Sequence, residues 1–205
     1  MRFLFLGAGA IGTYVGGSLA AAGESVTFVE RSRTVEAIRA HGLKVHTQQA
    51  TRLVRDFTAF DNPAEALAAG PYDIGVFALK SFDTRAALDE LVATGFDVPT
   101  ILSLQNGVDN EAMLATVLGA DKVIAGTVGT AVSKAGVGEV REEKHRGIGV
   151  ALGHPLSEAL VATLDRAGLS GRAFARAADM KWSKLLTNLT GNATSAILDR
   201  NVTEL

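Results

Sequence analysis

The chain of 205 residues contains no cysteine. This absence excludes disulfide bonds, zinc sites built from thiolates, and cysteine nucleophiles. The four histidines lack the spacing of metal ligands, so we predict no metal site and expect surface or structural roles for His41, His46, His145 and His154.

Long runs of one charge are also missing. The 20 Lys and Arg residues and 22 Asp and Glu residues give a net charge of −2, and no basic run indicates a nucleic-acid surface. The apolar run at the N-terminus is too short to span a membrane, and it lacks the long apolar region and cleavage site of a signal peptide. We therefore expect a soluble cytoplasmic protein whose partner is a small molecule rather than a nucleic acid or a membrane.

The most informative segment that is present is a glycine-rich turn. The apolar run Arg2–Leu6 predicts a buried strand, which leads into Gly-Ala-Gly-Ala-Ile-Gly at residues 7–12 and then into a helix of small residues. Gly7 permits the tight turn, Gly9 leaves room for a pyrophosphate, and Gly12 lets the helix pack close to the strand. The helix N-terminus offers N–H groups to the phosphates. This context favours dinucleotide binding over a turn that serves packing alone.

Strands and helices alternate through the first two-thirds of the chain. Strands are expected at 25–30, 43–46, 52–57, 72–79 and 100–104, and helices at 33–41, 63–69, 81–92 and 110–118, with Asn62 and Ser81 as N-caps. Apolar strands separated by helices predict an α/β fold, a Rossmann-type doubly wound parallel sheet.

The pattern changes after Lys122. Strands at 123–132, 138–141 and 147–152 predict a small antiparallel extension, with Glu142 to Arg146 as the solvated tip of a hairpin. A helix at 155–167 and a strand at 172–174 would complete a dinucleotide-binding domain of residues 1–175.

The segment 178–198 has the character of one long helix. Its apolar residues recur at helical spacing and need a packing partner; they are Trp182, Leu185, Leu186, Leu189, Ala193 and Ile197. We expect residues 176–205 to be the first helix of an all-helical C-terminal domain whose remainder is truncated, cleaved away or supplied by a partner. The uncovered face predicts self-association, with a homodimer as one form.

Polar residues on the same helix form a second pattern. Lys184, Asn188 and Asn192 lie four residues apart, so an α-helix rotates each by only about 40° from the last. Such a stripe suits an anionic, oxygen-rich substrate, although spacing alone also fits a solvated face. Lys80 and Asn106 each follow an apolar strand, where ligands of doubly wound sheets bind.

Taken together, these pieces resemble the ketopantoate reductase (2-dehydropantoate 2-reductase) family. The matching segments are residues 7–12, Leu79-Lys80-Ser81, Gln105-Asn106-Gly107-Val108, 126–131, Lys181 to Asn188, Asn192 and the terminal Glu204-Leu205. The resemblance implies reduction of ketopantoate to pantoate in pantothenate and coenzyme A synthesis, with hydride from NADPH.

The resemblance also implies roles for individual residues. Lys184 matches the catalytic lysine, which would hydrogen-bond the ketone oxygen and supply a proton. The implied substrate-binding residues are Asn188, Asn192 and Asn106. The implied cofactor-binding residues are Gly7, Ala8, Gly9, Ala10, Ile11, Gly12, Arg31, Lys80, Asn106 and Ala131.

The choice of cofactor stays open at this stage. Arg31 matches a contact to the 2′-phosphate of NADP and favours NADP(H), whereas Glu30 is the residue type that binds a free 2′-hydroxyl, which leaves NAD(H) as an alternative. Two functional alternatives also remain: a related reductase of another 2-oxoacid, and a non-catalytic NADP-binding module.

Overall fold

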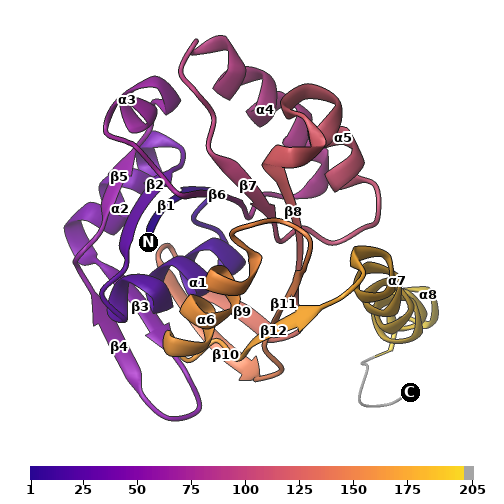
Figure 1. The fold of residues 1–205 in the computed structure, drawn as a ribbon. Coiled ribbons are helices and arrows are strands. Elements are labelled where there is room, and N and C mark those ends of the chain that lie inside the picture. Colours follow the sequence, from indigo (N-terminus) through magenta and orange to yellow (C-terminus); the bar gives the residue numbers. More distant parts are fainter. Residues whose placement is uncertain (201–205) are drawn as a thin grey trace.

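The computed structural model describes residues 1–200, and Glu204 and Leu205 lie outside this range. The fold is α/β, as predicted, with two sheets and a C-terminal helix (Figure 1). The larger sheet has eight strands in the spatial order β12 (Gly171–Phe174), β11 (Ile148–Ala151), β8 (Val123–Val128), β7 (Thr100–Ser103), β6 (Ile74–Phe77), β1 (Arg2–Leu6), β2 (Ser25–Val29) and β5 (Thr58–Phe60).

Six neighbouring strands of this sheet are parallel, and in spatial order they are β5, β2, β1, β6, β7 and β8. In order along the chain, their arrangement is 3-2-1-4-5-6, the doubly wound order of dinucleotide-binding folds. The chain reverses its direction of winding between β1 and β6. Ligands of such sheets bind at this switch point, beyond the carboxyl ends of the strands.

Alternate residues of β1 explain why helices cover both faces of the sheet. Phe3 and Phe5 join one core cluster, whereas Leu4 and Leu6 join another, because successive side chains of a strand point to opposite faces. The first cluster includes residues of α1 (Ala10–Ala21), α2 (Ser32–His41) and α6 (Ser157–Arg166). The second includes residues of α3 (Pro63–Ala68), α4 (Thr84–Ala93) and α5 (Asn110–Leu118).

The second sheet has the order β4 (Thr51–Val54), β3 (Leu43–His46), β10 (Glu139–Lys144) and β9 (Ala131–Gly136). It packs on α1, where a Cβ at Gly17 would come within 2.9 Å of Val45. The predicted solvated hairpin tip at 142–146 is wrong, because residues 142–144 continue β10 and Glu142 is buried.

Three other predicted elements differ from the structure. The expected strand 52–57 is replaced by β4 and the separate strand β5, and the expected strand 123–132 breaks at Gly129 and Thr130 into β8 and β9. Ser81 begins the 3₁₀ turn η1 (Ser81–Asp83) instead of capping α4. Asn62, in contrast, caps α3 as predicted, since its side chain accepts hydrogen bonds from the N–H groups of Ala64 and Glu65.

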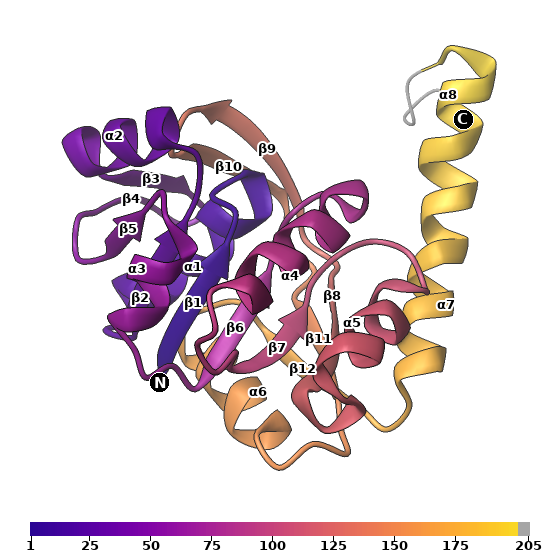
Figure 2. The same ribbon diagram turned by 90° about the horizontal axis from the view of Figure 1, so that it is seen from above.

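The C-terminal segment is one continuous helical rod made of α7 (Ala177–Asn188), a π-helical turn η3 (Leu189–Ala193) and α8 (Thr194–Leu198). Figure 2 shows its first turns beside α5 and its far end standing away from the body. Trp182, Leu186, Leu189 and Ile197 are exposed on it, as their spacing predicted. Within residues 1–200, none of the helices combines the length and apolar character needed to cross a membrane.

Candidate active site

The glycine turn has the geometry that the sequence predicted. Gly7 has a φ of +101°, which favours glycine, and a Cβ at Gly12 would lie 1.9 Å from the carbonyl oxygen of Gly7. A Cβ at Gly9 would meet nothing within 4 Å, so the space beside Gly9 is open. Within residues 1–200, no side chain caps the N-terminus of α1. The turn therefore has room and N–H donors for a pyrophosphate, as a bound dinucleotide requires.

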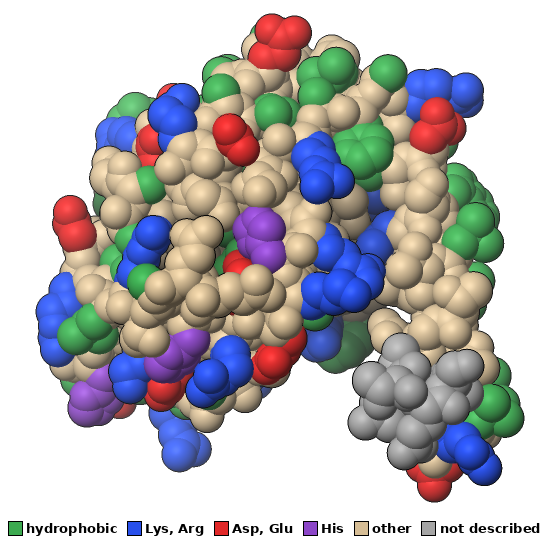
Figure 3. All heavy atoms as spheres, turned by 90° about the horizontal axis from the view of Figure 1, so that it is seen from below, with side chains coloured by type: hydrophobic (Ala, Val, Ile, Leu, Met, Phe, Trp, Pro, Cys, Tyr) green, Lys and Arg blue, Asp and Glu red, His purple; other side chains and the backbone are tan. Residues whose placement is uncertain are grey.

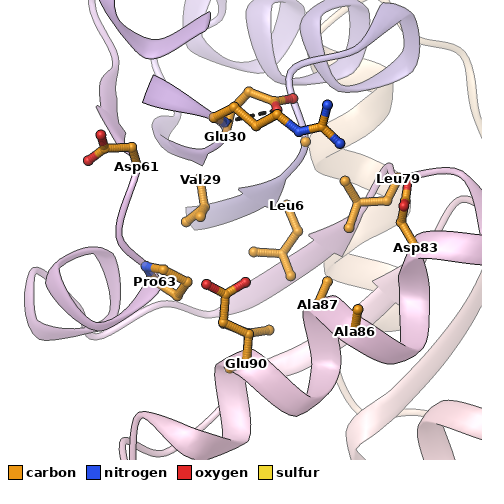
Figure 4. Close-up of a pocket in the computed structure, with 13 residues that line it drawn as sticks. Leu6, Val29, Glu30, Asp61, Pro63, Leu79, Asp83, Ala86, Ala87 and Glu90 are labelled. Carbon is orange, nitrogen blue, oxygen red and sulfur yellow. Dashed lines mark hydrogen bonds between the residues drawn. The ribbon is translucent and has the colours of Figure 1, made fainter. Parts of the chain in front are cut away.

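A pocket of about 290 Å³ lies beside this turn, at the switch point between β1 and β6 (Figure 4). Its lining residues come from the ends of β1, β2 and β5 and from the segment that follows β6; they are Leu6, Gly7, Val29, Glu30, Arg31, Asp61, Pro63, Leu79, Asp83, Ala86, Ala87, Glu90 and Leu91. Arg31, a predicted cofactor residue, thus lies at the same pocket as the glycine turn.

Glu30 accepts two backbone hydrogen bonds that its position in the sequence did not predict. Its Oε2 accepts a hydrogen bond of 2.9 Å from the N–H of Ala8, and its Oε1 accepts another of 2.9 Å from the N–H of Arg31. The carboxylate is therefore held against the glycine turn by two backbone donors.

Lys181 lies at the site, although the sequence analysis assigned it no role of its own and named it only within the matching segment Lys181 to Asn188. Its side chain is buried, and its Nζ donates to the carbonyl oxygens of Gln105 at 2.8 Å and Gly126 at 3.3 Å and pairs with Glu111 at 2.7 Å. Gln105 follows β7 and Gly126 belongs to β8, so Lys181 fixes α7 to the main sheet. The spacing of three residues from Lys181 to Lys184 gave no sign of this burial.

One turn further along α7, Lys184 is half-buried. Burial lowers the pKa of its ammonium, and the nearby guanidinium of Arg146 lowers it further. Arg146 precedes β11, whose first residue Ile148 pairs with Val128 at the carboxyl end of β8. Figure 3 shows basic side chains gathered where the body meets the C-terminal helix. Arg146 is thus a neighbour of Lys184 that the sequence analysis missed by placing it in a hairpin tip.

Asn106 and Asn188 also come together. The Nδ2 of Asn188 donates to the Oδ1 of Asn106 over 3.4 Å, which joins α7 to the loop after β7. Next to them, the buried Oε1 of Gln105 has no hydrogen-bond partner among the described residues. The two predicted asparagines therefore lie next to a residue whose buried amide oxygen lacks a donor among the described residues.

Three predicted residues are not joined to this group. Lys80 is exposed after β6, Ala131 is exposed at the start of β9, and Asn192 is exposed in the π-helical turn. Because π-type hydrogen bonds span five residues, such a turn holds more residues than an α turn. The expectation of an unbroken α-helix from Asn188 to Asn192 is wrong, and the 40° rotation does not apply to that step.

His145 has the structural role that was expected for the histidines. Its Nδ1 lies 2.9 Å from the carboxylate of Glu142, and its Nε2 lies 2.8 Å from the Ser170 hydroxyl. The Tyr14 hydroxyl of α1 donates to the same carboxylate. The cluster of Tyr14, Glu142, His145 and Ser170 therefore connects α1, both sheets and the loop before β12.

A second cavity of about 480 Å³ lies apart from the glycine turn, between α5, β8 and the start of α7. Its polar lining residues are Glu111, Asp121 and His154, and it contains none of the predicted site residues. Among residues 1–200, no three His, Asp or Glu side chains are grouped to hold a metal ion.

The strand order and the glycine turn define a dinucleotide-binding protein of the Rossmann class. Residues 3–153 match the family described as "Ketopantoate reductase PanE/ApbA". The chain belongs to this family of pyridine-nucleotide-dependent oxidoreductases.

Individual relatives agree with this assignment. The chain is 32% identical to a 2-dehydropantoate 2-reductase of Pyrococcus horikoshii and 32% identical to one of Halobacterium salinarum, each over 97% of this chain. It spans 64% and 66% of the length of these curated relatives. The crystal structure of a PanE/ApbA family ketopantoate reductase from Ralstonia eutropha JMP134 superposes with a TM-score of 0.86 at 33% identity, covering 97% of this chain and 65% of that one.

Proposed function

We propose that this chain contributes the cofactor site and the proton donor of a 2-dehydropantoate 2-reductase. The reaction is reduction of ketopantoate to pantoate, a step of pantothenate and coenzyme A synthesis. The observation that carries the proposal is the position of Lys184, which lies with Asn188 and Asn106 at the carboxyl edge of the sheet that holds the glycine turn.

The chemistry divides between the cofactor and this chain's residues. A bound reduced nicotinamide dinucleotide supplies the hydride that adds to the carbonyl carbon. The ammonium of Lys184 hydrogen-bonds the carbonyl oxygen and stabilises the negative charge that develops there. Lys184 then gives its proton to that oxygen, which becomes the hydroxyl of the product, and regains a proton from solvent.

The lowered pKa of Lys184 fits this role. An ammonium with an ordinary lysine pKa of about 10.4 holds its proton too firmly to be an ideal acid near neutral pH. Partial burial and Arg146 weaken its hold on the proton. Asn106 and Asn188 offer amide groups to the oxygens of the substrate.

The choice between NADPH and NADH depends on the residues at the end of β2. Arg31 and the family resemblance support NADPH, whereas the carboxylate of Glu30 supports NADH. Both residues line the pocket at the glycine turn.

We also propose a division into two domains. Residues 1–175 hold the nucleotide, and residues from 176 onward begin a helical domain. Support comes from the exposed apolar side chains of the C-terminal rod, such as Trp182 and Leu186, which lack a covering layer in residues 1–200.

A titration tests the proposed function. NADPH and NADH are each titrated by fluorescence with and without ketopantoate. We expect nucleotide binding and loss of the reduced-cofactor signal when ketopantoate is added. The Lys184→Ala variant should bind nucleotide as before and lose most turnover. Equal turnover in that variant would remove Lys184 from the mechanism.

The same assay separates the two alternatives. If ketopantoate is no better a substrate than simpler 2-oxoacids, the chain belongs to a reductase of other specificity. If nucleotide binds but no 2-oxoacid is reduced, even with a C-terminal helical domain supplied, a non-catalytic NADP-binding module is the better description.

A further inference from the structure

The carboxylate of Glu30 occupies a fixed place in the pocket beside the glycine turn. One of its oxygens accepts from the N–H of Ala8 in the glycine turn, and the other accepts from the N–H of Arg31. Both bonds measure 2.9 Å. Because each oxygen is held by a backbone donor, the carboxylate cannot swing away from the pocket without losing both bonds.

The rest of the pocket adds negative charge around this carboxylate. Four carboxylates line it, from Glu30, Asp61, Asp83 and Glu90, against one cation, Arg31. Figure 4 shows Glu90 extending from α4 toward the pocket on the side opposite Glu30, while the carboxylate of Asp61 points outward at the rim. The lining residues are therefore acidic in balance.

The two cofactors differ in the group that this charge would meet. The adenosine ribose of NADH carries two hydroxyls, which can donate hydrogen bonds to a carboxylate. NADPH carries a phosphate in place of the 2′-hydroxyl, with a charge of about −1.5 to −2 near neutral pH, as for other phosphate monoesters. Like charges within a few ångströms repel each other, and burial strengthens the repulsion.

Arg31 offsets this repulsion only in part. Its backbone N–H donates to Glu30, and its exposed guanidinium is the one cation among the described residues that line the pocket. Because the Arg31 guanidinium is exposed, solvent and salt screen its attraction for a phosphate.

We propose that Glu30, held by Ala8 and Arg31 in an acidic pocket, makes this chain bind NADH more tightly than NADPH. The inference rests on the proposed function for the location of the nucleotide, and it goes against the NADPH expectation drawn from Arg31. Glu30 is a specificity-determining residue that contacts the cofactor.

Fluorescence titration of the 205-residue chain with NADH and with NADPH measures the preference directly, without turnover. We expect the dissociation constant for NADPH to exceed that for NADH by ~10-fold or more, the scale of one lost or repelled charged contact. The Glu30→Gln variant keeps one acceptor oxygen for Ala8 and removes the charge. Its ratio should fall toward unity, chiefly because NADPH binds more tightly.

Two further variants guard against a local folding effect at Glu30. Glu90→Gln changes an exposed side chain of α4 that makes no hydrogen bond to the glycine turn in the described structure, and it should shift the ratio in the same direction. Glu36→Gln, on the exposed face of α2 and outside the pocket lining, is the matched control and should leave the ratio unchanged.

The outcomes separate this inference from the proposed function. NADPH binding as tightly as NADH or more tightly would overturn the inference, whether or not ketopantoate is reduced. The inference is supported if NADH binds more tightly than NADPH and the Glu30→Gln variant lowers the ratio of the two dissociation constants. Failure to reduce ketopantoate would then count only against the proposed reductase. Binding of neither nucleotide would overturn both.

Discussion

At the scale of single residues, Lys184 and Arg146 form a pair of like charges. Burial of Lys184 is the larger cause of its lowered pKa, and Arg146 adds to it. Among residues 1–200, neither side chain has a carboxylate partner within salt-bridge distance. An anionic 2-oxoacid would therefore meet two cations at the point where its carbonyl must be protonated.

Replacing Arg146 tests this pair. Lys184 must be protonated to act, so turnover should fall as pH rises through its pKa, below the ordinary lysine value. The Arg146→Ala variant removes the neighbouring cation, which should raise the pKa of Lys184 and move the fall to higher pH. A pH–rate profile of ketopantoate reduction measures the shift. Arg141→Ala, a substitution at an exposed position on β10, is the control and should leave the pH–rate profile unchanged. An unchanged profile in Arg146→Ala would contradict the effect of Arg146 on the pKa of Lys184.

An alanine substitution should have different effects on stability at Gly9 and at Gly12. Gly9→Ala adds a methyl group into open space at a φ of −72°, so the fold should be unaffected while the phosphates lose room and nucleotide binding weakens. Gly12→Ala would place its Cβ 1.9 Å from the oxygen of Gly7, so it should lower the melting temperature as well. Calorimetry of both variants, with nucleotide titrations, distinguishes them. Equal melting temperatures would contradict this account.

At the scale of elements, buried Lys181 helps to hold α7 in position, beside Met180, which packs against the main sheet. Lys181 connects it to the loop after β7, to β8 and to Glu111 of α5. The 3.4 Å contact between Asn188 and Asn106 lies two turns further along and depends on that placement.

Lys181→Met should release α7 from the sheet. Glu111 would lose its partner and two carbonyl groups would lose a donor, at a cost of about 3 kcal/mol for a buried pair. Because α7 is peripheral, we expect the loss as faster amide hydrogen exchange in residues 177–188, with turnover reduced. Lys134→Met, an exposed change on β9, is the matched control. Unchanged exchange in α7 would show that other contacts hold it.

At the scale of the whole molecule, the cluster around Glu142 joins α1 to both sheets. Burial acts to raise the pKa of Glu142, but hydrogen bonds from Tyr14 and His145 outweigh it and the net pKa is lowered. Burial is also the main cause of the raised pKa of Tyr14, which keeps its hydroxyl a donor. Residues more than a hundred positions apart therefore depend on one ionised carboxylate.

The stability of the protein should reflect that charge. A carboxylate with a lowered folded-state pKa stabilises the fold fully above its unfolded pKa, about 4.3, and this stabilisation disappears as pH falls through the folded value. Urea unfolding at a series of pH values should show the loss in the native chain. Glu142→Gln should be less stable near neutral pH by about 1.5–3 kcal/mol and lose less on acidification. An identical pH dependence in both would contradict the role of Glu142.

The exposed apolar side of the C-terminal rod predicts self-association. Trp182, Leu186, Leu189 and Ile197 are each at least half exposed, and such a row is costly to leave in water. Light scattering should show a concentration-dependent increase in mass, reduced in a Leu186→Glu, Leu189→Glu variant. A strictly monomeric native chain would contradict the expectation of a homodimer or larger assembly.

The sequence by itself determined the α/β class, the doubly wound parallel sheet and the glycine turn, and these predictions are confirmed. Each depends on patterns within a few residues, such as apolar runs, glycines at fixed spacing and the Asn62 cap. The roles of Lys184, Asn188, Asn192 and the cofactor residues stay predictions, because the structure shows where they lie and not what they bind.

Only the tertiary structure decided which distant residues meet. Different elements meet where Lys181 and Glu142 are buried, where Asn188 contacts Asn106, and where the N–H of Ala8 donates to Glu30. Local sequence patterns do not predict these contacts, because a charged residue is expected in solvent unless its partner in the fold is known. Periodicity likewise assumed an unbroken α-helix, whereas Asn192 lies within the π-helical turn, where the α-helical rotation does not apply. Secondary structure follows from local chemistry, whereas the site depends on contacts made only when the sheet and the helices pack.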